Sequence, residues 1–289
     1  MQVINLFDPW KSKFCTCPTK YSFSPYTGCS HGCLYCYASS YIPNFFTCKP
    51  KKDLLKRLAS DLKKIDKRIY VSIANSSDPY PPLEHKLRLT RDCLKLLVAN
   101  NCKFLLITKS NLVERDKDVL SKAKVCVSFS LTTLDEDAAK KLEPNAPLPQ
   151  KRLAAMENLI KHNIQVAMRI DPIIPGINDS EIGDLLKSVA EIGVKHIVSS
   201  TYKARFDSWN RMYKVFPEVM EKLKDLYFRQ GEKISNSYYL PTSIRFKLMK
   251  KVKESCDKFG LTFACCREGF IELNTPKSCD GSHLITINL

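Results

Sequence analysis

The stretch KFLLITKSNLVERDKDVLSKAKVCVSFSLTT, residues 103–133, contains two apolar runs separated by a short helical pattern. Continuous apolar runs joined by helices are typical of parallel strands that are buried on both faces. The same alternation continues in both directions, back to RIYVSIA at residues 68–74 and forward to KHIVSS at residues 195–200. We therefore predict an α/β fold on a parallel sheet, either a barrel or a doubly wound sheet.

Polar residues follow each predicted strand. These segments are residues 75–79, 108–110, 128–133, 171–172 and 199–201. Because ligand sites of parallel α/β folds lie at the C-terminal ends of the strands, we expect these segments to form the site.

The composition limits the class of protein. Of 289 residues, 44% are hydrophobic and 26% charged, which are ordinary globular values and exclude collagen-like, coiled-coil and low-complexity chains. No apolar run approaches the roughly 18 residues of a membrane helix, and the opening residues MQVINLFDPWKSKF lack the apolar segment of a signal peptide. We expect a cytoplasmic protein without a membrane partner.

The net charge of +16 favours a polyanionic partner such as DNA or RNA. Basic residues are dense at residues 49–68 and 244–258, and both segments have the apolar spacing of helices. A solvated basic face on each amphipathic helix is the alternative explanation.

Thirteen cysteines in a chain that we expect to be cytoplasmic indicate metal, cluster or redox chemistry, or core packing. Cys93, Cys102, Cys126 and Cys256 fall on apolar faces, so we expect them in the core.

The segment SPYTGCSHGCLYCYA, residues 24–38, spaces Cys29, Cys33 and Cys36 as C-x3-C-x2-C. Three thiolates on one tight loop can bind three irons of a [4Fe-4S] cluster and leave the fourth iron open. Gly28 and Gly32 allow the loop to wrap closely. A structural zinc ion would need four ligands, and His31 inside the loop is poorly placed to be the fourth, so we favour the cluster.

These residues carry a resemblance to a known family. With SSDPYPPLE, ITKSNLVERDKDVL, SFSLTT, LEPNAP and PIIPGIND, the motif makes residues 20–202 similar to the spore photoproduct lyase-like group of the radical S-adenosylmethionine (SAM) superfamily, also described as DNA-repair-photolyase-like. The resemblance implies a partial (β/α)6 barrel over residues 25–202. Residues 1–24 would then be an N-terminal extension, and residues 203–289 a helical, cysteine-containing C-terminal segment.

The resemblance also implies the chemistry. A [4Fe-4S] cluster would bind SAM at its open iron and cleave it reductively to a 5′-deoxyadenosyl radical, which abstracts a hydrogen atom from the substrate. The electron would come from a low-potential donor such as ferredoxin or flavodoxin.

Four residues match cofactor positions of the family. Tyr35 stands before the last cluster cysteine, where it would meet adenine, and Lys109 would neutralise the methionyl carboxylate. Ser77 and Ser130 match serines near the cofactor. Ordinary packing or surface roles are the alternatives for all four.

One position departs from the family. Spore photoproduct lyases carry a hydrogen-donating cysteine where this chain has Asn75, and an amide cannot donate a hydrogen atom as a thiol does. We therefore expect a radical SAM enzyme that modifies or repairs nucleic acid, but not by ordinary spore photoproduct repair. A protein, peptide or small-molecule substrate is the alternative, and a non-catalytic, metal-stabilised nucleic-acid-binding protein is another.

Five further cysteines lie outside the motif. Cys15, Cys17, Cys265, Cys266 and Cys279 are candidate ligands of an auxiliary iron-sulfur cluster or zinc ion. Adjacent cysteines cannot easily bind one cluster together, so we favour Cys266 and Cys279 over Cys265. Unrelated buried thiols are the alternative.

Overall fold

The centre of the molecule is an eight-stranded sheet. In this computed structural model, which describes residues 2–7 and 14–285, the strand order is β1-β2-β5-β6-β7-β8-β9-β12. The strands are β1 Asn5–Leu6, β2 Tyr21–Phe23, β5 Val71–Ile73, β6 Lys103–Thr108, β7 Lys124–Ser130, β8 Gln165–Ile173, β9 His196–Thr201 and β12 Thr262–Cys265. All neighbours from β2 to β12 pair in parallel, and β1 pairs antiparallel with β2. The predicted parallel α/β sheet is confirmed.

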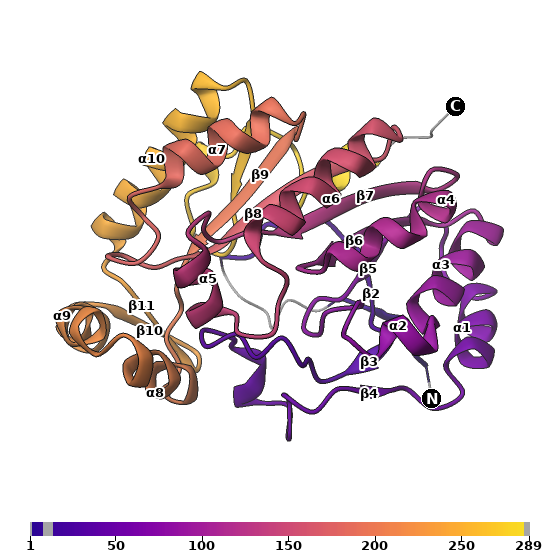
Figure 1. Cartoon of the computed structure of the whole chain (residues 1–289), viewed down its shortest axis with the longest axis horizontal. Helices are drawn as coiled ribbons and strands as arrows, with labels where there is room; N and C mark the ends of the chain where they lie inside the picture. The colour runs from indigo at the N-terminus through magenta and orange to yellow at the C-terminus, as the bar shows by residue number, and fades with distance from the viewer. Residues whose placement is uncertain (1, 8–13, 286–289) are drawn as a thin grey trace.

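Helices connect the strands and form an arc outside the sheet (Figure 1). The helices are α1 Leu54–Leu62, α2 Glu84–Leu87, α3 Leu89–Ala99, α4 Lys117–Leu120, α5 Glu136–Leu142, α6 Pro149–Lys161, α7 Ile182–Glu191, α8 Phe206–Val215, α9 Pro217–Phe228 and α10 Thr242–Lys258. Because β1 and β12 are the ends of the strand order, the sheet is an open, partial barrel, as predicted.

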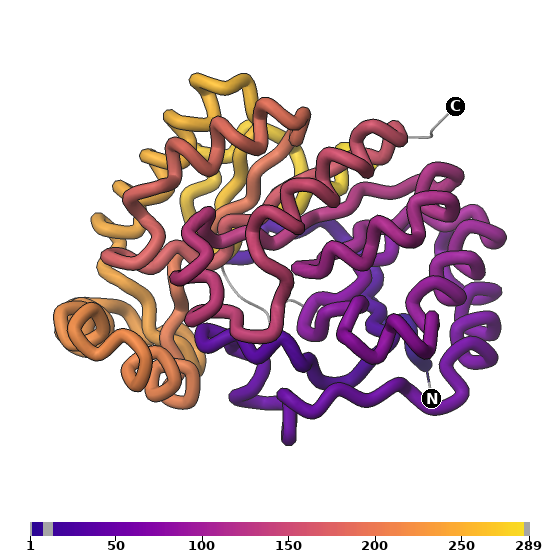
Figure 2. Tube along the Cα trace, viewed as in Figure 1, coloured from indigo at the N-terminus to yellow at the C-terminus, as the bar shows by residue number. Residues whose placement is uncertain are grey.

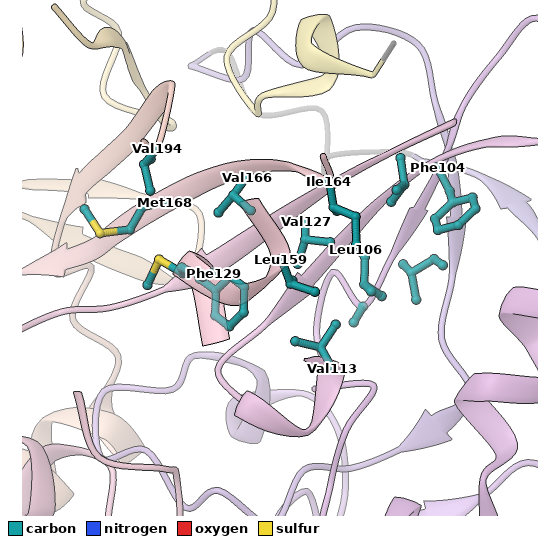
Figure 3. Close-up of a cluster of buried hydrophobic side chains, with 14 of the residues drawn as sticks. Phe104, Leu106, Val113, Val127, Phe129, Leu159, Ile164, Val166, Met168 and Val194 are labelled. Atoms are coloured by element: carbon teal, nitrogen blue, oxygen red, sulfur yellow. The ribbon is translucent and has the colours of Figure 1, made fainter. Parts of the chain in front are cut away.

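The core lies between the sheet and the outer helices (Figure 3). Phe104 and Leu106 of β6, Phe129 of β7 and Met168 of β8 are fully buried there with Leu159 of α6. The four cysteines expected in the core, Cys93, Cys102, Cys126 and Cys256, are at most 3% exposed, which confirms that prediction.

The sheet extends past both ends of the segment expected to form the barrel. The strand β2 lies before residue 25, and β12 lies after residue 202. Counted from β2, the strands β2 and β5 to β9 supply the six of a (β/α)6 barrel, and β12 adds one more. The expected N-terminal extension, residues 1–24, includes residues 1 and 8–13, which lie outside the described residues.

The C-terminal segment contains more than the expected helices. The helices α8 and α9 are separate because Pro217 lacks the N–H that would continue the first helix. A hairpin of β10 (Glu232–Ile234) and β11 (Ser237–Tyr239) follows them, and the path of the chain can be traced in Figure 2. Within the described part of the chain, no helix has the length and apolar character needed to cross a membrane.

Candidate active site

A cavity of about 730 Å³ opens at the C-terminal ends of the strands. Its wall includes residues that follow β5, β6 and β9, such as Ser77, Lys109 and Lys203, and also Ser130 at the end of β7. Cys29, Cys33 and Cys36 line the same cavity. Residues from each of the polar segments expected to form the site therefore line one cavity.

The segment of residues 28–36, here called the cluster loop, follows β2 and a two-residue strand, β3 (Tyr26–Thr27), which pairs with β4 (Lys49–Pro50). Gly28 has a φ of 77°, and a Cβ at this position would lie 2.5 Å from the carbonyl oxygen of Thr47 and 2.6 Å from that of Phe45. The N–H of Cys29 donates to the carbonyl of Phe45 at 2.7 Å. The loop can pack this closely because residue 28 has no side chain.

The three thiols of the cluster loop are close enough to affect one another electrostatically. Burial raises the pKa of Cys29 to about 12, and the nearby charge of Asp78 adds to this effect. Burial also raises the pKa of Cys33 and of Cys36. Because metals bind thiolates, loading this loop must release protons.

Asp78 ties the cluster loop to the ends of β5 and β6. It lies 3.2 Å from Nε2 of His31, and it accepts hydrogen bonds from the hydroxyl of Thr108 at 2.8 Å and from the N–H of Lys109 at 2.7 Å. Burial opposes ionisation of Asp78, but His31 and the backbone donors outweigh it and lower the pKa. The charged carboxylate thus fixes the loop against the sheet.

Glu143 is a second buried carboxylate that contacts the cluster loop. Its carboxylate accepts a hydrogen bond from the hydroxyl of Tyr35, forms an ion pair with Arg152, and lies 3.7 Å from the ammonium of Lys109. Burial opposes the charge on Glu143, but Arg152 and Lys109 lower its pKa to about 2. Tyr35 and Lys109, two candidate cofactor residues from the sequence, therefore both interact with one carboxylate. No sequence pattern indicated this role for Glu143.

Comparisons with known proteins identify the family. Residues 23–189, more than half of the chain, match the family described as "Radical SAM superfamily". The chain belongs to the radical SAM superfamily. It is therefore an enzyme of the radical SAM type, and the family implies a [4Fe-4S] cluster and SAM as cofactors.

The chain is also similar to individual proteins and solved structures. An uncharacterized protein of Mycobacterium tuberculosis is 26% identical over 268 residues, covering 84% of this chain and 76% of that protein. A protein named radical SAM Nalpha-GlyT isomerase, from Pseudomonas phage M6, is 22% identical over 84% of this chain and 53% of that protein. A spore photoproduct lyase structure complexed with dinucleoside spore photoproduct superposes with a TM-score of 0.69 at 16% identity, covering 83% of this chain and 75% of that one, which shows a shared fold.

The radical SAM cluster fits the residues present. Three thiols on a loop that tolerates no side chain at Gly28 line a cavity large enough for further ligands. The donor set matches the three-thiolate ligation that leaves one iron open. Cys29, Cys33 and Cys36 are thus the residues that would hold the cluster.

The remaining cofactor candidates of this radical SAM enzyme also line the cavity. Ser77 is 5% exposed and Ser130 is 8% exposed. Asn75 accepts a hydrogen bond from Ser72 at 2.9 Å and donates one to Ser22 at 2.8 Å. Its amide is therefore held in position at the cavity wall.

Charged groups lie on the radical SAM cavity and beside it, and sequence reasoning missed Arg169, Arg267 and Glu268 among them. Arg169 forms an ion pair with Asp171 at 2.8 Å, and Lys203 forms one with Glu268 at 2.9 Å. The side chain of Arg267 also lines the cavity. The position of Arg169 inside a predicted strand was a usable signal, because a cation within an otherwise apolar run needs a buried partner.

The five further cysteines separate into two groups. Cys15, Cys17, Cys266 and Cys279 line the cavity, whereas Cys265 belongs to the hydrophobic core. Across residues 2–7 and 14–285, no three side chains of His, Cys, Asp or Glu are arranged to hold a single metal ion.

Proposed function

We propose that this radical SAM enzyme acts on nucleic acid, by abstracting a hydrogen atom from a nucleotide within the cavity. Cys29, Cys33 and Cys36 would hold the [4Fe-4S] cluster. When bound, the cluster and SAM supply the electron and the 5′-deoxyadenosyl radical for that abstraction. The chain's own residues bind and orient the two reactants and exclude water from them.

Lys109 is suited to the methionyl carboxylate of SAM. Its ammonium lies 3.7 Å from Glu143, beyond hydrogen-bond distance, while Arg152 and Tyr35 already bind that carboxylate directly. Burial opposes the charge on Lys109, but Glu143 and Cys33 outweigh it and raise the pKa. The ammonium is therefore charged and can donate to an incoming carboxylate. Ser77 and Ser130 offer hydroxyls on the same wall.

The cationic and aromatic lining of the cavity is the observation that best supports a nucleic-acid substrate. Within the described part of the chain, seven lysine and arginine residues line it against three aspartates, and the lining also includes Tyr35, Tyr37 and Tyr41. Basic groups bind phosphates, and aromatic rings stack on unpaired bases. The spore photoproduct lyase structure, which shares this fold, holds a dinucleoside.

Arg267 is the residue of this lining best suited to bind a phosphate. Its Nε atom is buried without a hydrogen-bond partner among the residues that the structure describes. An unpartnered guanidinium N–H beside an open cavity is suited to an anionic ligand.

The electron donor in this proposal is a small, acidic, low-potential protein such as ferredoxin or flavodoxin. A chain with a net charge of +16 would attract such a partner electrostatically. The expected consequence is a reduction rate that falls as salt is added.

The ion pairs within the cavity favour a second class of substrate. This substrate would be a protein, a peptide or a small molecule. Lys20, Arg169 and Lys203 each have a carboxylate partner at 2.8 to 2.9 Å, so their charges are already largely compensated. Substrate binding would then depend little on salt.

Equilibrium binding separates these candidates. The reconstituted enzyme is titrated, without oxygen, into fluorescent single-stranded DNA or RNA at several salt concentrations. The proposal predicts that affinity falls at least about tenfold between 50 and 200 mM salt. Arg267→Gln should weaken binding and reduce the salt slope by about 0.7, whereas Lys250→Gln, on the exposed outer face of α10, should not change it. No binding, or binding that is insensitive to salt, would contradict a nucleic-acid substrate.

A further inference from the structure

Four thiols from opposite ends of the chain meet on the cavity wall. Cys15 and Cys17 come from the segment before β2, Cys266 follows β12, and Cys279 lies near the C-terminus. We call them the four-cysteine set. The ion pair between Lys20 and Asp280, at 2.8 Å, holds the two ends of the chain together beside these thiols.

Cys17 contacts two of the other thiols. The thiol of Cys279 donates to Sγ of Cys17 at 3.6 Å, and Cys15 also forms a side-chain hydrogen bond with Cys17. Cys17 thus lies between two thiols, and the ammonium of Lys20 is 3.4 Å from its sulfur. A central sulfur surrounded by donors is in the environment of a thiolate.

Cys266 approaches the other three from the end of β12. The N–H of Cys266 donates to the carbonyl of Ser199 at 2.8 Å, which fixes the backbone at this point. Because successive side chains of a strand point to opposite faces, Cys265 faces the core while Cys266 faces the cavity. Cys266 interacts electrostatically with Cys15, Cys17 and Cys279.

Cationic side chains surround the set. Lys20 contacts Cys17, Arg169 forms a side-chain hydrogen bond with Cys266, and the ammonium of Lys203 lies 3.4 Å from the carbonyl of Cys266. Four thiolates around a metal carry a net negative charge. Although Lys20, Arg169 and Lys203 each also have a carboxylate partner, their N–H groups can still donate to the sulfurs and backbone of such a site. The surroundings are therefore suited to a metal centre, rather than to four neutral core thiols.

We propose that Cys15, Cys17, Cys266 and Cys279 hold a second iron-sulfur cluster on the wall of the cavity that the cluster loop lines. This site is separate from the cluster loop and does not depend on the identity of the substrate. Loading it releases thiol protons, as at the first site.

The arrangement of the sulfurs favours a cluster over zinc. A tetrahedral zinc site places its sulfurs about 3.8 Å apart, because each Zn–S bond is about 2.3 Å long. Cys17 and Cys279 are at such a distance, but the described residues contain no three side chains gathered for one ion. In a cluster each thiolate binds a different iron, so a wider set is accommodated. Cys29, Cys33 and Cys36 are likewise not gathered for a single ion.

Metal analysis of cysteine variants tests this proposal. Each protein is reconstituted with ferrous iron and sulfide in the absence of oxygen, and its iron, acid-labile sulfide and zinc are measured. The wild type should hold about eight irons, and a variant with Cys29, Cys33 and Cys36 all changed to Ala should keep about four, with matching sulfide. Adding Cys17→Ser or Cys279→Ser to that variant should remove the remaining iron. Adding Cys265→Ala, the neighbouring core thiol, should leave it in place.

Three results would overturn the second cluster while leaving the first intact. They are a triple variant without iron, a triple variant with about one zinc and no sulfide, and a disulfide between Cys17 and Cys279 detected by mass spectrometry in that variant. Far-ultraviolet circular dichroism on every variant checks that it is folded. A wild type without iron would instead contradict the radical SAM cluster itself.

Discussion

The cluster loop and the four-cysteine set hold their thiols in different ways. The cluster loop carries Cys29, Cys33 and Cys36 within eight residues, so its spacing alone points to a cluster. The four-cysteine set gathers residues that are up to 264 positions apart, from Cys15 to Cys279. A local motif can be recognised in the sequence, whereas an assembled site depends on the sheet that brings its parts together. Even the cluster loop, however, depends on distant carboxylates for its position.

Removing the carboxylate of Glu143 should lower the free energy of unfolding more than any other substitution considered below. Glu143→Gln would leave Arg152 and Lys109 charged and buried without their carboxylate. Removing one partner of a buried ion pair typically lowers the free energy of unfolding by about 3 to 5 kcal/mol. Urea unfolding of the metal-free protein measures this. The control is Glu136→Gln, whose exposed pair with Lys140 should contribute less than about 1 kcal/mol. Equal effects of the two variants would contradict the anchoring role of Glu143.

The same carboxylate predicts a dependence on pH. The pKa of Glu143 is lowered from 4.5 to about 2 in the folded protein, because Arg152 and Lys109 outweigh the effect of burial. A lowered pKa stabilises the fold above the unfolded value, so the contribution is complete above about pH 4.5 and is lost as pH falls toward 2. The difference in unfolding free energy between wild type and Glu143→Gln should therefore shrink over this range. A difference that stays constant from pH 6 to pH 3 would be inconsistent with this assignment.

Lys109 should affect SAM binding more than the fold. Lys109→Gln removes the charge proposed to meet the methionyl carboxylate, and a hydrogen bond to a charged group contributes about 1.5 to 3 kcal/mol. Calorimetric titration with SAM should show affinity weakened by about tenfold to a hundredfold. Iron content should stay the same, because Lys109 is not a cluster ligand. Unchanged SAM affinity would exclude the proposed role.

A substitution at Gly28 tests whether the cluster loop needs close backbone packing for stability and iron uptake. Gly28→Ala places a Cβ 2.5 Å from the carbonyl oxygen of Thr47 in a left-handed conformation, which should lower the unfolding free energy by about 1 to 3 kcal/mol and reduce iron uptake. Gly183→Ala is the matched control, because a Cβ there meets no atom within 4 Å and the residue lies in α7. That control should be neutral or stabilise the protein by up to about 1 kcal/mol. Similar iron uptake in both variants would argue against a close-packed loop.

The features that the sequence predicted are those set by near neighbours in the chain. The strands β6 and β7 follow from continuous apolar runs, and the cluster ligands follow from the C-x3-C-x2-C spacing. Burial of Cys93 and Cys256 followed from their positions on apolar faces. Each signal lies within a dozen residues, where periodicity is informative.

The features that escaped prediction depend on three-dimensional pairing. Nothing near Glu143 in the sequence shows that it meets Tyr35, 108 positions away, or that Asp78 meets His31. The C-terminal hairpin of β10 and β11 also escaped prediction, because strands of only three residues are too short to show a clear hydrophobic pattern. The opposite orientations of Cys265 and Cys266 follow from strand alternation, but only once β12 is known to be a strand.

The most direct test of this account is SAM cleavage by the reconstituted, dithionite-reduced enzyme. Formation of 5′-deoxyadenosine is followed by chromatography in wild type, in the Cys29/Cys33/Cys36→Ala variant and in Cys48→Ala, a cysteine that does not line the cavity among the described residues. We expect 5′-deoxyadenosine from the wild type and from Cys48→Ala, and none from the triple variant. A wild type that binds iron at these cysteines but never cleaves SAM, or a triple variant that still does, would contradict it.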